Sequence, residues 1–284
     1  MLKYFIKKME QKKFIKMQGL GNDFVIFFWD GSLPSKKLIQ NLSNRKIGIG
    51  CDLSMFLKSS ENNLVDYEAN FFNSDGSEAE VCGNALRCVG KLNFHRTKKK
   101  TCLVETKAGL IDVEYVNEHK IIVNVGVAKF NWKDIPISKN IDTSNLNLNY
   151  DYLKNGFALN VGNPHLVFFV DTLDLKKFKK DSEKIKKKSL FSEGVNISIV
   201  KVNSREAISI ITNERGVGIT QACGTGACAS VVASNKLNFV EKKVTVTTSG
   251  GLLDIEICDD NNILMAGNAE IVFEGEINFS GLQS

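Results

Sequence analysis

The chain carries the stretch GNDFVI at residues 21–26 and a related stretch, GNPHLV, at residues 162–167. Three further pairs match in the same order: CGN at 82–84 with CGT at 223–225, residues 106–114 with 248–256, and residues 121–123 with 263–265. Four collinear matches at an offset of 141 or 142 residues indicate an internal duplication. We therefore expect the 284 residues to form two copies of one domain.

Each copy shows the same succession of elements. A Gly-Asn turn leads into a strand rich in Phe, Val and Ile, followed by a lysine-bearing helix, a polar loop, an apolar helix and alternating strands. The apolar helices are predicted at residues 83–94 and 224–237, each opened by a Cys-Gly pair. This succession predicts an α+β fold. We expect one domain to comprise residues 1–126 and 269–284 and the other residues 127–268, the C-terminal segment returning to the first domain.

Composition excludes several classes of protein. With 43% hydrophobic and 24% charged residues, the chain has the balance of an ordinary globular protein rather than a disordered one. No run approaches the roughly 18–20 apolar residues of a membrane span, so we expect no membrane association. Seven cysteines form an odd set, and the first sixteen residues show no secretory signal. Both observations predict free thiols in a reducing, cytoplasmic compartment.

Charge gives little indication of a nucleic-acid partner. The net charge is +5, and the densest basic run, residues 176–188, has eight lysines at positions compatible with an amphipathic helix. Nucleic-acid surfaces favour arginine and interleaved aromatic residues, which this run lacks apart from Phe178. A solvated helix face is the better interpretation, and we predict no nucleic-acid partner.

Cys82 and Cys223 occupy equivalent positions of the duplication, each at the start of a predicted helix. A helix N-terminus offers unpaired N–H groups and a partial positive charge, so we expect the pKa of a thiol there to be lowered. The amides of the following residues, Gly83-Asn84 and Gly224-Thr225, should form an anion pocket suited to a carboxylate.

Two such thiols suit inversion at a carbon that bears hydrogen. If the copies pack about a pseudo-twofold axis, one thiolate would remove the Cα proton while the other thiol supplies a proton to the opposite face. A structural disulfide between the two cysteines is the weaker alternative in a reducing compartment. A metal site is also the weaker alternative, because the chain has only three histidines and no Cys-x-x-Cys pair.

The sequence resembles the diaminopimelate epimerase family over nearly the whole chain after about residue 14. The motifs that carry the resemblance are KMQGLGNDF at 16–24, GIGCD at 48–52, FNSDGSE at 72–78, CGN at 82–84, GNPH at 162–165, GVN at 194–196, ERGVG at 214–218, ACGTGAC at 222–228 and FEGE at 273–276. The chain departs from the family pattern at Gln18, at Ala85-Leu86, and at Leu53, where many members have a glutamine that contacts substrate.

The resemblance implies a role for individual residues. Cys82 and Cys223 match the catalytic acid/base cysteines, and His165 and Glu214 match the groups that assist them. The residues that match substrate-binding positions are Asn22, Asn73, Gly83, Asn84, Asn163, Asn196, Glu214, Arg215, Gly224 and Thr225. The family fold implies two pseudo-symmetric domains, each a mixed or antiparallel, barrel-like sheet around a central helix. It further implies a cytoplasmic homodimer that acts on a small amino acid, with no metal and no pyridoxal phosphate.

Other functions remain open from the sequence. Another cofactor-independent racemase with paired cysteines, of the proline or hydroxyproline type, is the nearest alternative; Arg215 and the asparagines favour a substrate with two amino-carboxylate ends. Phenazine-biosynthesis isomerases share the fold but lack the cysteine pair. A thiol redox or carboxylate-binding protein is the alternative from a different class.

Overall fold

The computed structural model describes residues 11–282. Residues 1–10, part of the N-terminal segment in which no secretory signal is predicted, lie outside the described residues. The chain divides into two compact units, Met1–Glu118 with Asn268–Ser284, and His119–Gly267. This division lies before the boundary expected at residue 126, because strand β8 (Lys120–Val127) pairs with β17 (Asn262–Gly267) of the second unit. None of the helices among the described residues is long and apolar enough to cross a membrane.

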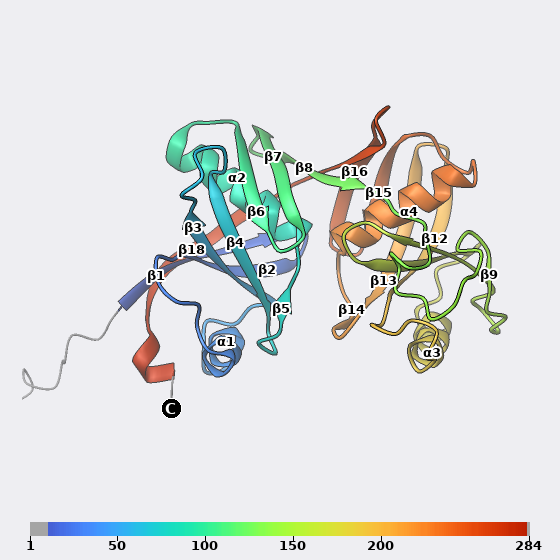
Figure 1. Cartoon of the computed structure of the whole chain (residues 1–284), viewed down its shortest axis with the longest axis horizontal. Coiled ribbons are helices and arrows are strands. Elements are labelled where there is room, and N and C mark those ends of the chain that lie inside the picture. The colour runs from blue at the N-terminus through green and yellow to red at the C-terminus, as the bar shows by residue number, and fades with distance from the viewer. Residues whose placement is uncertain (1–10, 283–284) are drawn as a thin grey trace, which may run out of the picture. The chain divides into compact units, whose positions relative to one another are not determined.

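The first unit is a mixed sheet with one enclosed helix and one outer helix (Figure 1). Its elements are β1 (Gln11–Gly19), β2 (Asn22–Phe28), α1 (Lys36–Ser43), β3 (Leu53–Ser59), β4 (Tyr67–Asn73), β5 (Glu78–Ala79), α2 (Gly83–Thr97), β6 (Thr101–Thr106), β7 (Gly109–Asn117), β18 (Glu270–Asn278) and the 3-10 helix η2 (Phe279–Leu282). The strands pair in the order β18-β1-β2-β3-β4-β6-β7, with β2–β3 and β4–β6 parallel. The C-terminal strand β18 thus returns to β1.

The second unit repeats this plan. Its elements are β8, β9 (Leu146–Asn147), β10 (Asn155–Asn160), β11 (Pro164–Phe169), α3 (Leu175–Lys186), β12 (Asn196–Ser204), β13 (Ala207–Glu214), β14 (Gly218–Ile219), α4 (Gly224–Lys236), β15 (Lys243–Thr248), β16 (Gly251–Ile257) and β17. The parallel pairs are β11–β12 and β13–β15, in the same places as in the first unit. The predicted α+β duplication is therefore confirmed.

In each unit the sheet curves around the helix that follows the cysteine. Helix α2 contacts β1 towards one end of the strand order and β6 and β7 at the other, and α4 contacts strands from β10 to β17. Both helices bury most of their side chains, α4 through small residues such as Ala, Ser and Gly that allow strands to approach closely. This enclosure fixes where the first turn of each helix lies.

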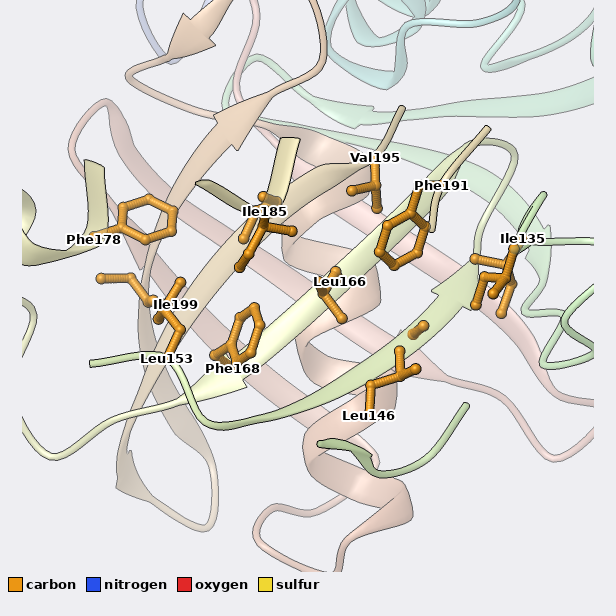
Figure 2. Packing of buried hydrophobic residues seen from close by; sticks show 13 residues of the cluster. Ile135, Leu146, Leu153, Leu166, Phe168, Phe178, Ile185, Phe191, Val195 and Ile199 are labelled. Carbon is orange, nitrogen blue, oxygen red and sulfur yellow. The ribbon is translucent and has the colours of Figure 1, made fainter. Parts of the chain in front are cut away.

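The outer helix α3 is attached to its sheet by an apolar cluster (Figure 2). Phe178 and Ile185, two turns apart on α3, pack with Leu166 and Phe168 of β11 and with Ile199 of β12. The buried face explains why the lysine-rich segment folds as a helix, because its hydrophobic residues recur at helical spacing. The cluster holds α3 against the sheet from its first turn to its last.

Candidate active site

Cys82 is the N-cap of α2, with extended backbone angles before the first helical residue, Gly83. Its half-buried thiol lies 3.9 Å from Asn22 Oδ1. Asn84, on the first turn of α2, donates from Nδ2 to the same oxygen at 3.2 Å. The structure thus brings together Asn22, Cys82, Gly83 and Asn84, as the sequence predicted for this half.

A hydrogen bond to Asp52 fixes the orientation of the Asn22 amide. Asn22 Nδ2 donates to Asp52 Oδ2 at 3.0 Å. An ionised carboxylate only accepts hydrogen bonds, so the amide nitrogen must face Asp52 and the oxygen must face the thiol. The thiol of Cys82 therefore meets an acceptor.

Asp52 is itself held in a network of charges. Arg45 bonds both oxygens of Asp23 at 2.8 and 2.7 Å and reaches Asp52 at 2.9 Å. Lys16 pairs with Asp23 at 2.6 Å and also donates to the Gly50 carbonyl. Burial opposes ionisation of Asp23, but Arg45 and Lys16 outweigh it and hold the pKa of that carboxyl well below its usual range. The Asp23 carboxylate thus keeps its charge, and the network of hydrogen bonds supports the turn at Asn22.

Asn73 lies at the end of β4, where Leu53 is its neighbour on β3. Its Nδ2 donates to Ser77 Oγ at 3.0 Å. The Ser77 amide in turn donates to Asp75 Oδ1, which closes the turn. Leu53 is buried. Gln18 accepts from the Gly21 amide and so supports the turn before Asn22.

In the second unit Cys223 is the N-cap of α4, and its sulfur accepts from the Gly226 amide at 3.4 Å. Thr225 Oγ1 lies 3.6 Å away. Burial, followed by the charge of Glu214, raises the pKa of the Cys223 thiol well above its usual value, against the hydrogen bonds from Thr225 and Gly226. The prediction that the helix start lowers the pKa is therefore wrong for Cys223, because desolvation of the thiolate outweighs the helix N-terminus.

Glu214 and Arg215 follow one another at the end of β13. Thr220 Oγ1 donates to Glu214 Oε1 at 2.5 Å, which holds the carboxylate on the Cys223 side of the turn. The Arg215 amide donates to Asn196 Oδ1 at 2.8 Å, and its guanidinium donates to the Glu193 carbonyl at 2.9 Å. Asn196 is thus a support for the backbone of the Glu-Arg pair.

His165 and Asn163 form a second group. His165 is fully buried on β11, beside Asn196 on β12, and its Nε2 lies 2.8 Å from Asn163 Oδ1. Because that oxygen accepts, the proton resides on Nε2, and the buried Nδ1 has no hydrogen-bond partner among the described residues. Burial, helped by the Arg215 charge, lowers the pKa of His165 to about 3. The imidazole is therefore neutral.

Three residues that support the site, Asp52, Arg45 and Lys186, are not among the residues predicted for it. Lys186 Nζ donates to the Glu214 carbonyl at 2.7 Å. The only feature of the sequence that could have pointed to Arg45 is the rarity of arginine, since the chain has only five. Within residues 11–282 no group of three or more His, Cys, Asp or Glu is arranged to hold a metal ion.

Comparison with known proteins gives one family. The family model for diaminopimelate epimerase matches residues 14–131 and 157–272. A diaminopimelate epimerase of Zymomonas mobilis is 36% identical over 94% of this chain and 97% of that relative. One of Pelagibacter ubique is 39% identical over 90% of this chain and 94% of the relative.

Solved structures share the fold at low sequence identity. A hydroxyproline epimerase from Agrobacterium vitis superposes with a TM-score of 0.71 at 10% identity, over 94% of this chain and 92% of the other. A phenazine biosynthesis protein of the PhzF family from Bacillus anthracis gives 0.68 at 17% identity, over 95% and 99%. These likenesses concern the fold alone.

Proposed function

The chain belongs to the diaminopimelate epimerase family, and we propose on that basis that it interconverts LL- and meso-2,6-diaminopimelate. The chain is an isomerase, an amino-acid epimerase whose product serves lysine and peptidoglycan precursor biosynthesis. The observation that carries the proposal is the pair of cysteines at equivalent helix starts, one in each unit.

Cys82 and Cys223 exchange the Cα proton in this proposal. One cysteine, as thiolate, removes the proton from one face of Cα, and the other, as thiol, delivers a proton to the opposite face; the roles reverse in the other direction. The raised pKa of Cys223 supports a protonated thiol ready to donate. The first-turn amides at Gly83-Asn84 and Gly224-Thr225 would stabilise the charge that develops on the substrate carboxylate.

Recognition of the substrate falls to the polar groups around the cysteines. Arg215 suits a bidentate grip on a carboxylate, and Glu214 an ammonium group. Asn22, Asn73 and Asn163 supply amide donors and acceptors for the amino-carboxylate end that does not react, and Asn196 positions Arg215 by accepting from its amide. His165, neutral and hydrogen-bonded to Asn163, assists as a polar but uncharged neighbour.

We further propose that the enzyme works as a homodimer in the cytoplasm. None of the seven cysteines, all of which lie among the described residues, forms a disulfide, as expected in a reducing compartment. The exposed apolar side chains of Ile271, Val272 and Phe273 on β18 offer a surface that a second copy would cover. Light scattering coupled to size exclusion should give twice the mass of one chain.

Exchange of the Cα hydrogen in deuterated water tests the activity. The enzyme is incubated with LL-diaminopimelate, with L-proline and with trans-4-hydroxy-L-proline, and loss of the Cα proton signal is followed by NMR. We expect exchange with diaminopimelate alone, accompanied by the meso isomer. Exchange with either proline substrate but not with diaminopimelate would refute the proposed substrate and favour a racemase of the proline type.

A further inference from the structure

One lysine of the basic helix α3 differs from the others in its surroundings. Seven of the eight lysines between residues 176 and 188 are exposed, whereas Lys186 is half-buried. Its Nζ donates to Asn213 Oδ1 at 2.5 Å and to the Glu214 carbonyl at 2.7 Å. Burial lowers the pKa of Lys186, and the charges of Glu214 and Glu183 act in the opposite direction. The Lys186 ammonium is therefore bonded to the end of β13 and does not lie on the solvent-exposed face of α3.

The position of Lys186 is set by the face of α3 that packs on the sheet. Its neighbour Ile185 is buried in the apolar cluster (Figure 2). One turn earlier, buried Ser182 accepts from Asn213 Nδ2 at 2.7 Å. Ser182 and Lys186 are four residues apart, so they lie on one helix face and hold the two ends of the same amide. That amide can point only one way, with its oxygen to the ammonium.

The segment that Lys186 holds leads directly to the candidate active site. Asn213 and Glu214 are the last residues of β13, and the Glu214 carboxylate is fixed by Thr220. The charge of Glu214 in turn raises the pKa of the Cys223 thiol. An ammonium bonded to the carbonyl of Glu214 both anchors this residue and offsets part of its negative charge.

We propose that Lys186 is a positioning residue that holds Glu214 and moderates its charge beside the Cys223 thiol. The inference rests on the proposed function and deepens it, because it assigns an outer helix a part in preparing one of the two acid/base groups. The ammonium itself touches neither the thiol nor the reacting carbon; it acts through Glu214.

The direction of the effect follows from the groups around the thiol. Glu214 raises the pKa of Cys223, while Thr225 and the Gly226 amide lower it; His165 on β11 is neutral. Loss of the Lys186 ammonium would leave the charge of Glu214 less compensated. The pKa of Cys223 should then rise further, and its thiolate should form less readily.

The test compares Lys186→Met with Lys187→Met, its exposed neighbour on the same helix end. The pH dependence of alkylation by iodoacetamide is measured at Cys223 and at Cys82 by peptide mass spectrometry. We expect the alkylation midpoint of Cys223 to move to higher pH in Lys186→Met only, with that of Cys82 unchanged in both variants. The same shift should appear in the pH profile of kcat/KM for epimerisation.

Two further variants separate charge from hydrogen bonding and guard against misfolding. Lys186→Arg should restore the midpoint, and Lys186→Gln, which keeps a donor without charge, should reproduce most of the shift. An unchanged Cys223 midpoint in folded Lys186→Met or Lys186→Gln, or an equal shift in Lys187→Met, would overturn the proposal. The alkylation readout needs no substrate, so a failure of the proposed activity is distinguished from a failure of this inference.

Discussion

Replacement of Asp52 by Asn should reverse the hydrogen bonding of the Cys82 thiol. Arg45, a donor only, bonds Asp52 Oδ1 at 2.9 Å and would claim the single oxygen of the new amide. The new Nδ2 would then face Asn22, whose own amide must turn over to accept. Asn22 would present N–H groups to the thiol in place of the present acceptor oxygen at 3.9 Å, and the hydrogen bond from Asn84 Nδ2 to that oxygen would be lost.

The magnitude follows from the bonds that change. Asp52 Oδ2 accepts from Asn22 Nδ2 at 3.0 Å and from the Asp23 amide at 3.2 Å. Hydrogen bonds to a charged group contribute about 1.5–3 kcal/mol. The Asp52 side chain is 46% exposed, so the lower end applies. If Asp52→Asn removes about 1.4 kcal/mol of stabilisation from the transition state, kcat/KM falls roughly tenfold.

The assay is alkylation of Cys82 as a function of pH, together with kcat/KM in both reaction directions. A thiolate that accepts N–H groups is stabilised, so the Cys82 midpoint should move to lower pH. Asp112→Asn, an exposed aspartate on β7, is the matched control and should leave the midpoint unchanged.

A double variant decides whether Asp52 acts through Asn22. In an Asn22→Ala background, Asp52→Asn should have little further effect on the Cys82 midpoint, because the amide that it reorients is gone. An equal shift with and without Asn22 would show that Asp52 acts directly by its charge, and the orientation argument would be refuted.

Three other outcomes are expected. Cys82→Ala and Cys223→Ala should each lower epimerisation by a factor of about 10² to 10⁴ with unchanged circular dichroism, and full activity in either would contradict the two-base mechanism. Glu214→Gln should move the alkylation midpoint of Cys223 to lower pH, since it removes the charge that raises the thiol pKa. His165 has a folded pKa of about 3, below its ordinary value of 6.5, so the unfolded chain binds the extra proton. The contribution of neutral His165 to the free energy of unfolding is complete above pH 6.5 and is lost as the pH falls towards 3, at about 1.4 kcal/mol per pH unit. Urea unfolding at pH 7 and pH 5 should show this dependence, and the His165→Gln variant should lack it.

The duplication and the main helices were predictable because they depend on local signals. The predicted helices at residues 83–94 and 224–237 appear as α2 and α4, each starting directly after its cysteine. The return of the C-terminal segment also appears, as β18 paired with β1. Repeated motifs and helix starts can be read from neighbouring residues alone.

The supports of the site could not be predicted in the same way. The hydrogen bonds from Arg45 to Asp23 and from Asn22 to Asp52 join residues 22 and 30 positions apart, and nothing in the local sequence specifies them. Lys186 has the same local pattern as the other lysines of α3 and differs only in the face on which it falls. The raised pKa of Cys223 depends on burial, which is a property of the packed unit.

The two halves share a backbone plan but surround their cysteines differently, and the reaction gives a reason. Cys82 faces the neutral amide of Asn22, whereas Cys223 lies beside the charge of Glu214, at the end of β13, where the first half has Ser74. Two-base inversion starts with one thiol protonated and the other ionised. Identical surroundings would give both thiols the same pKa, and neither thiol would then be preferentially protonated. A carboxylate beside Cys223 favours the protonated form of that thiol, which is the form that donates in one direction of the reaction.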